Sequence, residues 1–172
     1  LSFFGRLSYD FKGKYLFNAT LRRDGSSMLA QGKTWGTFPS VSGGWVISSE
    51  DFFPQSNQFS YVKLRASWGQ NGSLANLSPG QWAATISNRS NNSLIRYPLA
   101  GGGFGFGAAP SQMANPDLTW ETSEQIDIGA DLRFFNDQLT FSVDYFKKTT
   151  KDLIATGRPP LFAGIALPFI NA

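Results

Sequence analysis

The stretch that decides the fold is Ile126–Phe134, which reads IDIGADLRF. Apolar residues occupy every second position, and the positions between them hold charged residues or glycine. Successive side chains of a β-strand point to opposite faces of the sheet, whereas side chains on one face of a helix recur every 3–4 residues. The stretch therefore predicts a long strand with one apolar face and one charged face.

Five further segments carry the same two-residue period, so the chain predicts an all-β fold. On one face, 24 of 26 positions are apolar or aromatic, two are glycine and none is charged. On the opposite face, ten of 26 positions are charged and only four are large apolar residues. The six predicted strands span residues 2–11, 14–23, 38–48, 60–70, 120–135 and 138–148.

The length of these strands favours a membrane-spanning barrel. Strands of soluble proteins average about 5–6 residues, whereas a tilted membrane-spanning strand needs about 9–11. Glu124 interrupts the apolar face, but counting from the turn at Asn136 places it above an apolar band about 25 Å tall. Aromatic residues near the predicted strand ends match the two interfacial girdles of a barrel; they are Phe3, Phe11, Tyr15, Trp45, Trp68, Phe134 and Tyr145.

The connections between the predicted strands alternate in length. Residues 11–14 and 135–138 form tight turns and residues 49–54 form a moderate one, whereas the links 24–37, 71–119 and 149–172 are long. Outer-membrane barrels have short turns on the periplasmic side and long loops outside. We therefore expect an antiparallel up-and-down transmembrane β-barrel segment. The alternative is a soluble or secreted β-sandwich that acts as a carbohydrate-binding module.

Composition excludes several classes of function. The chain has 172 residues with no Cys and no His, so disulfides, a thiol nucleophile and zinc sites of the usual kinds are absent. The net charge of +3 comes from scattered Lys and Arg, which argues against nucleic-acid binding. Asp127 and Asp131 lie four residues apart on one strand face, about 13 Å and too far for a glycosidase pair. We expect no enzyme, no cofactor and no metal site.

Several blocks resemble the barrel of SusC/RagA-type TonB-dependent transporters. Three of them read FGRLSYDFKGKY from residue 4, WGTFPSVSGGW from residue 35 and VKLRASWGQNG from residue 62. Further blocks at 19–27, 115–122 and 141–153 follow in the order of the family. The resemblance implies a plugged barrel of about 22 strands in the outer membrane of a Bacteroidetes-type bacterium.

The resemblance also implies a function and a set of partners. Such proteins import glycan fragments or peptides, driven by TonB and commonly paired with a SusD-like surface lipoprotein that acts as a lid. The chain has no signal sequence, no plug and no TonB box, so we expect an internal piece of a barrel that continues on both sides. The implied partners are outer-membrane lipid, the protein's own plug domain, TonB through that plug, the lipoprotein and a small glycan or peptide. An adhesion or structural barrel without transport is a further alternative.

The charged face supplies the first candidate residues. One interpretation is that they line the lumen and contact the plug or the solute. The other is that a polar lumen needs charges that pair across strands. Asp127, Asp131 and Arg133 lie toward the periplasmic end, where plug contacts are expected. The full set is Arg6, Asp10, Arg22, Lys63, Arg65, Asp127, Asp131, Arg133 and Asp144.

The long link 71–119 and its end supply the second candidates. Aromatic faces beside amide and hydroxyl groups suit a sugar, and loops on a rigid scaffold often carry binding residues. The alternative is that these aromatic residues pack the loop onto itself. The candidates for substrate contact are Trp82, Arg89, Arg96, Tyr97 and Trp120.

Overall fold

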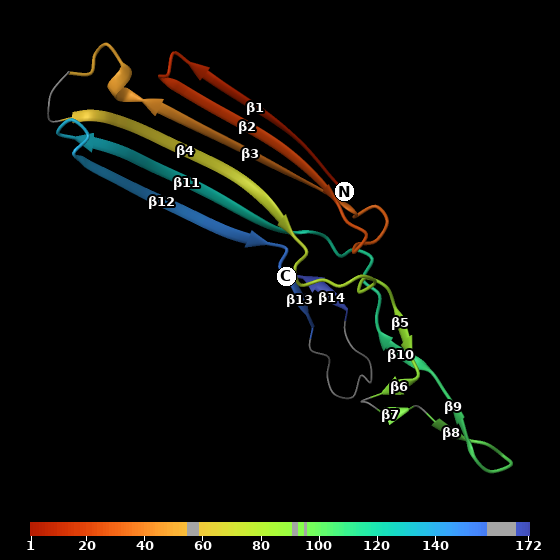
Figure 1. Ribbon diagram of the computed structural model, residues 1–172. Coiled ribbons are helices and arrows are strands. Elements are labelled where there is room, and N and C mark those ends of the chain that lie inside the picture. The colour runs from red at the N-terminus through yellow and green to blue at the C-terminus, as the bar shows by residue number, and fades with distance from the viewer. Residues whose placement is uncertain (55–58, 91–92, 95, 158–167) are drawn as a thin grey trace. The chain divides into compact units, whose positions relative to one another are not determined.

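The computed structural model of the chain describes residues 1–54, 59–90, 93–94, 96–157 and 168–172. Parts of the predicted long links, at 91–92, 95 and 158–167, lie outside these described residues. Six long strands form one sheet in the order β1-β2-β3-β4-β11-β12 (Figure 1). They are β1 (Ser2–Phe11), β2 (Tyr15–Gly25), β3 (Trp35–Val46), β4 (Phe59–Ser73), β11 (Glu121–Phe134) and β12 (Leu139–Lys151).

The sheet confirms the predicted all-β class with long antiparallel strands. Leu7 lies opposite Ala19, Gly43 opposite Ala66, and Ala130 opposite Val143 in the antiparallel pairs β1–β2, β3–β4 and β11–β12. Residues directly opposite each other share a face of the sheet. The apolar positions of neighbouring strands therefore combine into one apolar face, and the polar positions combine into the other. The sheet is open in this chain, with β1 and β12 at its edges.

The turn between β1 and β2 follows from its sequence. Lys12 and Gly13 have φ angles of 56° and 65°, the left-handed values that a type I′ turn requires at its two central residues. The Lys14 N–H donates to the Phe11 carbonyl at 3.0 Å, and Phe11 lies opposite Tyr15, so the loop has three residues. Asp10 supports the turn, because its Oδ1 accepts a hydrogen bond from the backbone N–H of Gly13 at 2.7 Å. This short turn fixes the register of the first two strands.

Several strand bounds differ from the predicted ones. The strand predicted at 14–23 continues to Gly25, and the strand predicted at 38–48 begins at Trp35. The strand predicted at 38–48 ends at Val46, and Ile47–Ser49 form the 3₁₀ turn η1, because the chain bends back so that Glu50 meets Lys14 and Trp45. The strands predicted to end at 70 and 148 continue to Ser73 and Lys151. In the described residues, no helical segment has the length and hydropathy to span a membrane.

The predicted long links contain short hairpins that the sequence pattern did not indicate. The chain divides into two compact units: a sheet unit of residues 1–25, 36–73 and 122–151, and a loop unit of residues 26–35, 74–121 and 152–172. The hairpins of the loop unit pair β5 (Thr85–Ser87) with β10 (Ala109–Gln112), β6 (Arg89–Ser90) with β7 (Ser93–Leu94), β8 (Arg96–Pro98) with β9 (Phe104–Phe106), and β13 (Ile154–Thr156) with β14 (Phe169–Asn171).

The loop unit has a small apolar core of its own. Leu29, Leu77, Leu118 and Ile154 are buried together, and Leu118 is fully inaccessible to solvent. Polar side chains tie the segments around this core, since the Asn115 amide donates to the carbonyl of Phe169 at 2.6 Å. The described parts of the links are therefore folded segments with a core.

Candidate functional site

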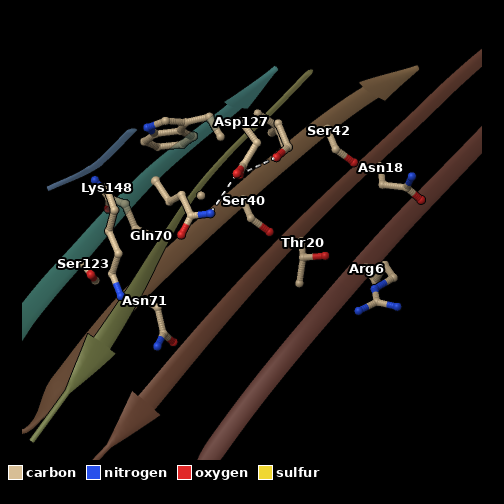
Figure 2. A pocket seen from close by; sticks show the side chains of 15 residues that line it. Arg6, Asn18, Thr20, Ser40, Ser42, Gln70, Asn71, Ser123, Asp127 and Lys148 are labelled. Atoms are coloured by element: carbon tan, nitrogen blue, oxygen red, sulfur yellow. Dashed lines mark hydrogen bonds between the residues drawn. The ribbon is translucent and has the colours of Figure 1, made fainter. Parts of the chain in front are cut away.

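The polar face of the sheet encloses a cavity of about 680 Å³ (Figure 2). All six long strands contribute to its lining, so this face is concave. Its charged groups are Arg6 of β1, Asp127 of β11 and Lys148 of β12. Hydroxyl and amide groups dominate the remaining surface: Asn18, Thr20, Ser40, Ser42, Ser67, Gln70, Asn71, Ser123 and Gln125. We call this hollow the polar cavity.

Asp127 lies at the centre of a hydrogen-bonded group in the polar cavity. Its Oδ2 accepts a bond from Ser67 Oγ at 3.1 Å, and its Oδ1 accepts one from Gln125 Nε2 at 2.8 Å (Figure 2). The first bond joins β11 to β4, and the second runs along β11. Both oxygens of the carboxylate are thus held in place by neutral donors.

A cross-strand network of charges lies on the same face. Arg65 of β4 donates to both oxygens of Asp131 at 3.0 and 3.2 Å. The same guanidinium lies 2.9 Å from an oxygen of Asp144 on β12, and Ser142 donates to Asp131 at 2.8 Å. Such two-point contacts between Arg and a carboxylate fix geometry as well as charge. These predicted residues are therefore paired across strands, as one of the two interpretations requires.

Most of the other charged candidates have local partners. Arg22 pairs with Asp24 at 2.6 Å. Arg133 lies 3.8 Å from Asp137 and its guanidinium stacks 4.9 Å from the ring centroid of Tyr61. Asp10 belongs to the first turn, while Lys63 and Arg65 border a second, smaller hollow. The structure thus brings Arg6 and Asp127 into one cavity, and Arg65, Asp131 and Asp144 into one network.

Sequence reasoning missed most of the cavity. Lys148 lies on the polar face but was not among the predicted candidates. The neutral lining residues were not predicted either, because serine, threonine and amide side chains are common in loops and strands alike. The signal that was available is strand parity, which places Ser67, Ser123 and Gln125 on the same face as Asp127.

The turn end of the sheet carries an aromatic cluster with a charged centre. Tyr15 and Trp45 stack with ring centroids 6.4 Å apart and an angle of 11° between planes, and Phe11 lies 6.4 Å from Tyr15. Glu50 accepts a bond from the Trp45 indole N–H at 3.1 Å and pairs with Lys14 at 3.1 Å. Hydrogen bonds from Tyr15, Trp45 and Lys14 lower the pKa of Glu50 below its ordinary value of 4.5.

The apolar face is open to its surroundings along the sheet. Leu7, Phe141 and Ile128 remain 62%, 53% and 56% exposed. Glu124, a charged residue on this face, accepts bonds from the Trp68 indole N–H at 2.8 Å and from Lys151 at 2.6 Å. A polar group therefore ends the apolar band toward the long links.

Two other aromatic candidates lie near ends of the sheet, and one does not. Phe134 stacks on Phe59 at the turn end, with centroids 5.1 Å apart, and Phe3 is near the start of β1. Tyr145 lies opposite Ile128 in mid-strand, because β12 continues three residues beyond its predicted end. Its predicted place in an interfacial girdle rested on that shorter strand.

The loop candidates are not gathered into one site. Trp82 and Trp120 pack against the buried core of the loop unit, which is the packing role that the sequence left open. Arg96 lies over the ring of Phe106, 5.9 Å from its centroid, and Tyr97 is 51% exposed opposite Gly105. Arg89 lies in β6. Across the described ranges, no group of three or more acidic side chains has the arrangement to hold a metal ion.

Comparison with known proteins identifies the sheet. The sequence model of the family described as TonB dependent receptor-like, beta-barrel matches residues 1–172. The TonB-dependent receptor SusC of Bacteroides thetaiotaomicron is 34% identical over 161 residues, which cover 94% of this chain and 16% of that protein. The TonB-dependent receptor P39 of Formosa agariphila is 36% identical over 161 residues, which cover 89% of this chain and 14% of that protein.

Solved structures show the same fold. The RagAB peptide importer in its closed-closed state matches with a TM-score of 0.80 and 27% identity, over 99% of this chain and 18% of that chain. The siderophore receptor PirA from Pseudomonas aeruginosa, at a TM-score of 0.55 and 15% identity, shares the fold alone. The chain thus spans less than a fifth of the length of SusC, of P39 and of the RagAB importer chain.

These relatives decide between the two folds that the sequence allowed, and the soluble β-sandwich is wrong. In barrels of this family the apolar face of the wall meets lipid and the polar face lines the lumen, and we name the two faces of this sheet the lipid face and the lumen face accordingly. The chain belongs to the TonB-dependent receptor β-barrel family and supplies six strands of an outer-membrane barrel.

Proposed function

We propose that the full-length protein imports a small nutrient, an oligosaccharide or a short peptide, across the outer membrane. The observation that carries the proposal is a sheet of a TonB-dependent receptor barrel with a predominantly apolar lipid face and a concave, hydrogen-bonding lumen face. The apolar face of such a wall remains in contact with lipid, while its polar face lines a path for a polar solute. The protein acts by gated passage and has no catalytic role.

The proposed machinery extends beyond this chain. A plug domain closes the barrel and links it to TonB, which supplies the energy, and a SusD-like surface lipoprotein covers the outer mouth. SusC and the RagAB peptide importer support this assignment, because both are similar to this chain over nearly its whole length. Lumen-facing charges that are paired within the wall, such as Arg65 with Asp131, maintain its shape.

The test is deletion of the full gene in its own bacterium. We expect loss of growth on one class of sole nutrient, either defined oligosaccharides or short peptides, with restored growth on the corresponding monomers. A variant that lacks only the segment that contacts TonB should lose uptake and retain binding of the solute at the cell surface. The gene should encode a plug upstream of this sheet, with a lipoprotein gene nearby.

An adhesion or structural barrel would behave differently. Its deletion would leave growth on every nutrient unchanged and would alter attachment or envelope integrity. Uptake that persists without the TonB-contacting segment would also contradict the proposal.

A further inference from the structure

The polar cavity holds two cations that lack acidic partners. Within the part of the chain that the structure describes, neither Arg6 nor Lys148 forms an ion pair, whereas Arg22 and Arg65 do. The acid in the cavity, Asp127, is held by Ser67 and Gln125. The cavity therefore has an excess of positive charge that the wall itself does not neutralise.

Each of these cations has an exposed phenylalanine two residues before it on the same strand face, outside the lining of the polar cavity. Phe4 precedes Arg6 by two residues in β1, and Phe146 precedes Lys148 by two residues in β12, so each pair shares the lumen face. Phe4 and Phe146 are 76% and 65% exposed. Contact with lipid does not explain large apolar side chains on this face. The two edge strands thus present the same pair of groups, a ring face and a cation.

The position of the cavity favours a solute over the plug. Asn71 and Ser123 lie within three residues of the ends of β4 and β11 that lead to the long links, and Lys148 lies three residues before the end of β12. In outer-membrane barrels the long links are on the outside, where the solute arrives. Nearer the short turns, Arg65 and Arg133 have partners in the wall, and Lys63 borders the smaller hollow without an ion pair among the described residues.

We infer that the polar cavity binds an acidic oligosaccharide, a saccharide that bears carboxylate or sulfate groups. Cations bind such anions through charge-assisted hydrogen bonds. Aromatic rings pack against the apolar face of a sugar ring, and hydroxyl and amide side chains hydrogen-bond its hydroxyl groups. The inference rests on the proposed import function and narrows its substrate class.

The experiment measures binding to the full-length receptor in detergent, with three probes: hexagalacturonate, uncharged maltohexaose and a hexaglutamate peptide. We expect the wild type to bind hexagalacturonate most tightly. The double variant Arg6→Gln with Lys148→Gln should lose about tenfold in that affinity, together with its salt dependence. Its affinity for maltohexaose should not change.

A matched control comes from the next residue along β12. Lys147 is opposite Ile126 on the lipid face, so Lys147→Gln removes the same charge from the other side of the wall and should leave all three affinities unchanged. Phe146→Ala should weaken both saccharides and spare the peptide. Heat-modified mobility of each variant on a gel confirms that the barrel is folded.

Three results would overturn the inference. The first is equal affinity of the wild type for the charged and uncharged hexasaccharides, and the second is tighter binding of the peptide. The third is a double variant that binds hexagalacturonate as tightly as the wild type, which would assign the cavity to contact with the plug. TonB-dependent uptake of a neutral solute alone would leave the import function standing and remove only the acidic specificity. Absence of TonB-dependent uptake of any solute would remove the import function itself.

Discussion

The two faces of the sheet use alternate residues of the same strands, and they hold their shape by different means. On the lumen face, Arg65 joins two carboxylates from neighbouring strands, and Asp127 is held by two neutral donors. On the lipid face, apolar side chains such as Leu7 remain exposed, and the charged Glu124 is near the end of the band with Trp68 and Lys151. The lumen face is held by specific hydrogen bonds and ion pairs between side chains, whereas the lipid face depends on the surrounding hydrocarbon.

The largest expected effect comes from a charge placed on the lipid face in mid-strand. Leu7→Arg should destabilise the folded barrel by about 2–4 kcal/mol, because its guanidinium must leave water for hydrocarbon. Ser8→Arg adds the same side chain to the adjacent lumen position, opposite Asn18, and should cost little. Denaturant unfolding of both full-length variants in lipid vesicles measures the difference. Equal losses would mean that the two faces do not differ in their surroundings.

The second prediction concerns close packing, which is tight at Gly72 of β4 and absent at Gly5 of β1. The ring of buried Phe38 covers Gly72, so a Cβ at this position would overlap the ring. Gly72→Ala should cost about 1–3 kcal/mol, since overpacking forces side chains out of their rotamers. Gly5→Ala on the lipid face is the control, because a Cβ there meets nothing within 4 Å. The same unfolding measurement tests both, and a neutral Gly72→Ala would show that Phe38 moves freely.

The third prediction tests whether the Arg65 network stabilises the wall. Arg65→Met leaves Asp131 and Asp144 without their shared cation and should lower the free energy of unfolding of the barrel by more than Arg133→Met does. Arg133→Met removes a charge whose partner Asp137 is 3.8 Å away and exposed, and it should cost less than about 0.5 kcal/mol. Adding Asp144→Asn to Arg65→Met should recover part of the loss, because it removes the repulsion between the two carboxylates. No recovery would mean that repulsion is not the cause.

Strand parity made the two faces predictable, because it is a local property of each strand. The partners across the faces were not predictable in the same way. Arg65 and Asp131 are 66 residues apart in the chain, and their contact depends on the register of β4 against β11. Charge pairing on the lumen face was thus foreseen as a class, but the particular pairs and the cavity were not.

The loop unit shows where sequence periodicity stops being informative. Its strands have two to four residues, which is too few to display a period of two. The exposed-looking tryptophans Trp82 and Trp120 pack on a core whose members, such as Leu29 and Ile154, come from three separate links. Only the fold brings these residues together, so an aromatic residue in a polar link was ambiguous in sequence.

The smallest effect is expected at the turn end, where the lipid face borders water and a carboxylate holds the aromatic cluster. The pKa of Glu50 is lowered by hydrogen bonds from Tyr15, Trp45 and Lys14, so the folded state favours the ionised form. The contribution of ionised Glu50 to the stability of the folded state is complete above the ordinary pKa of about 4.5, and it is lost as pH falls through the lower pKa of the folded state. Trp45 accordingly becomes more mobile at acid pH.

Trp45 fluorescence across the acid range tests whether ionised Glu50 holds Trp45 in place. The measurement uses a full-length background whose other tryptophans are replaced by phenylalanine. The wild-type signal should change below pH 4.5, whereas Glu50→Gln should start near the acid-state signal and stay flat with pH. Asp51→Asn is the matched control, because Asp51 is fully exposed and makes a weaker contact with Lys14, at a distance of 3.5 Å. A pH-dependent signal that survives in Glu50→Gln would assign the titration to another carboxylate. In that case ring stacking alone would hold the turn end, and this region would not differ from the rest of the lipid face, where apolar contacts dominate.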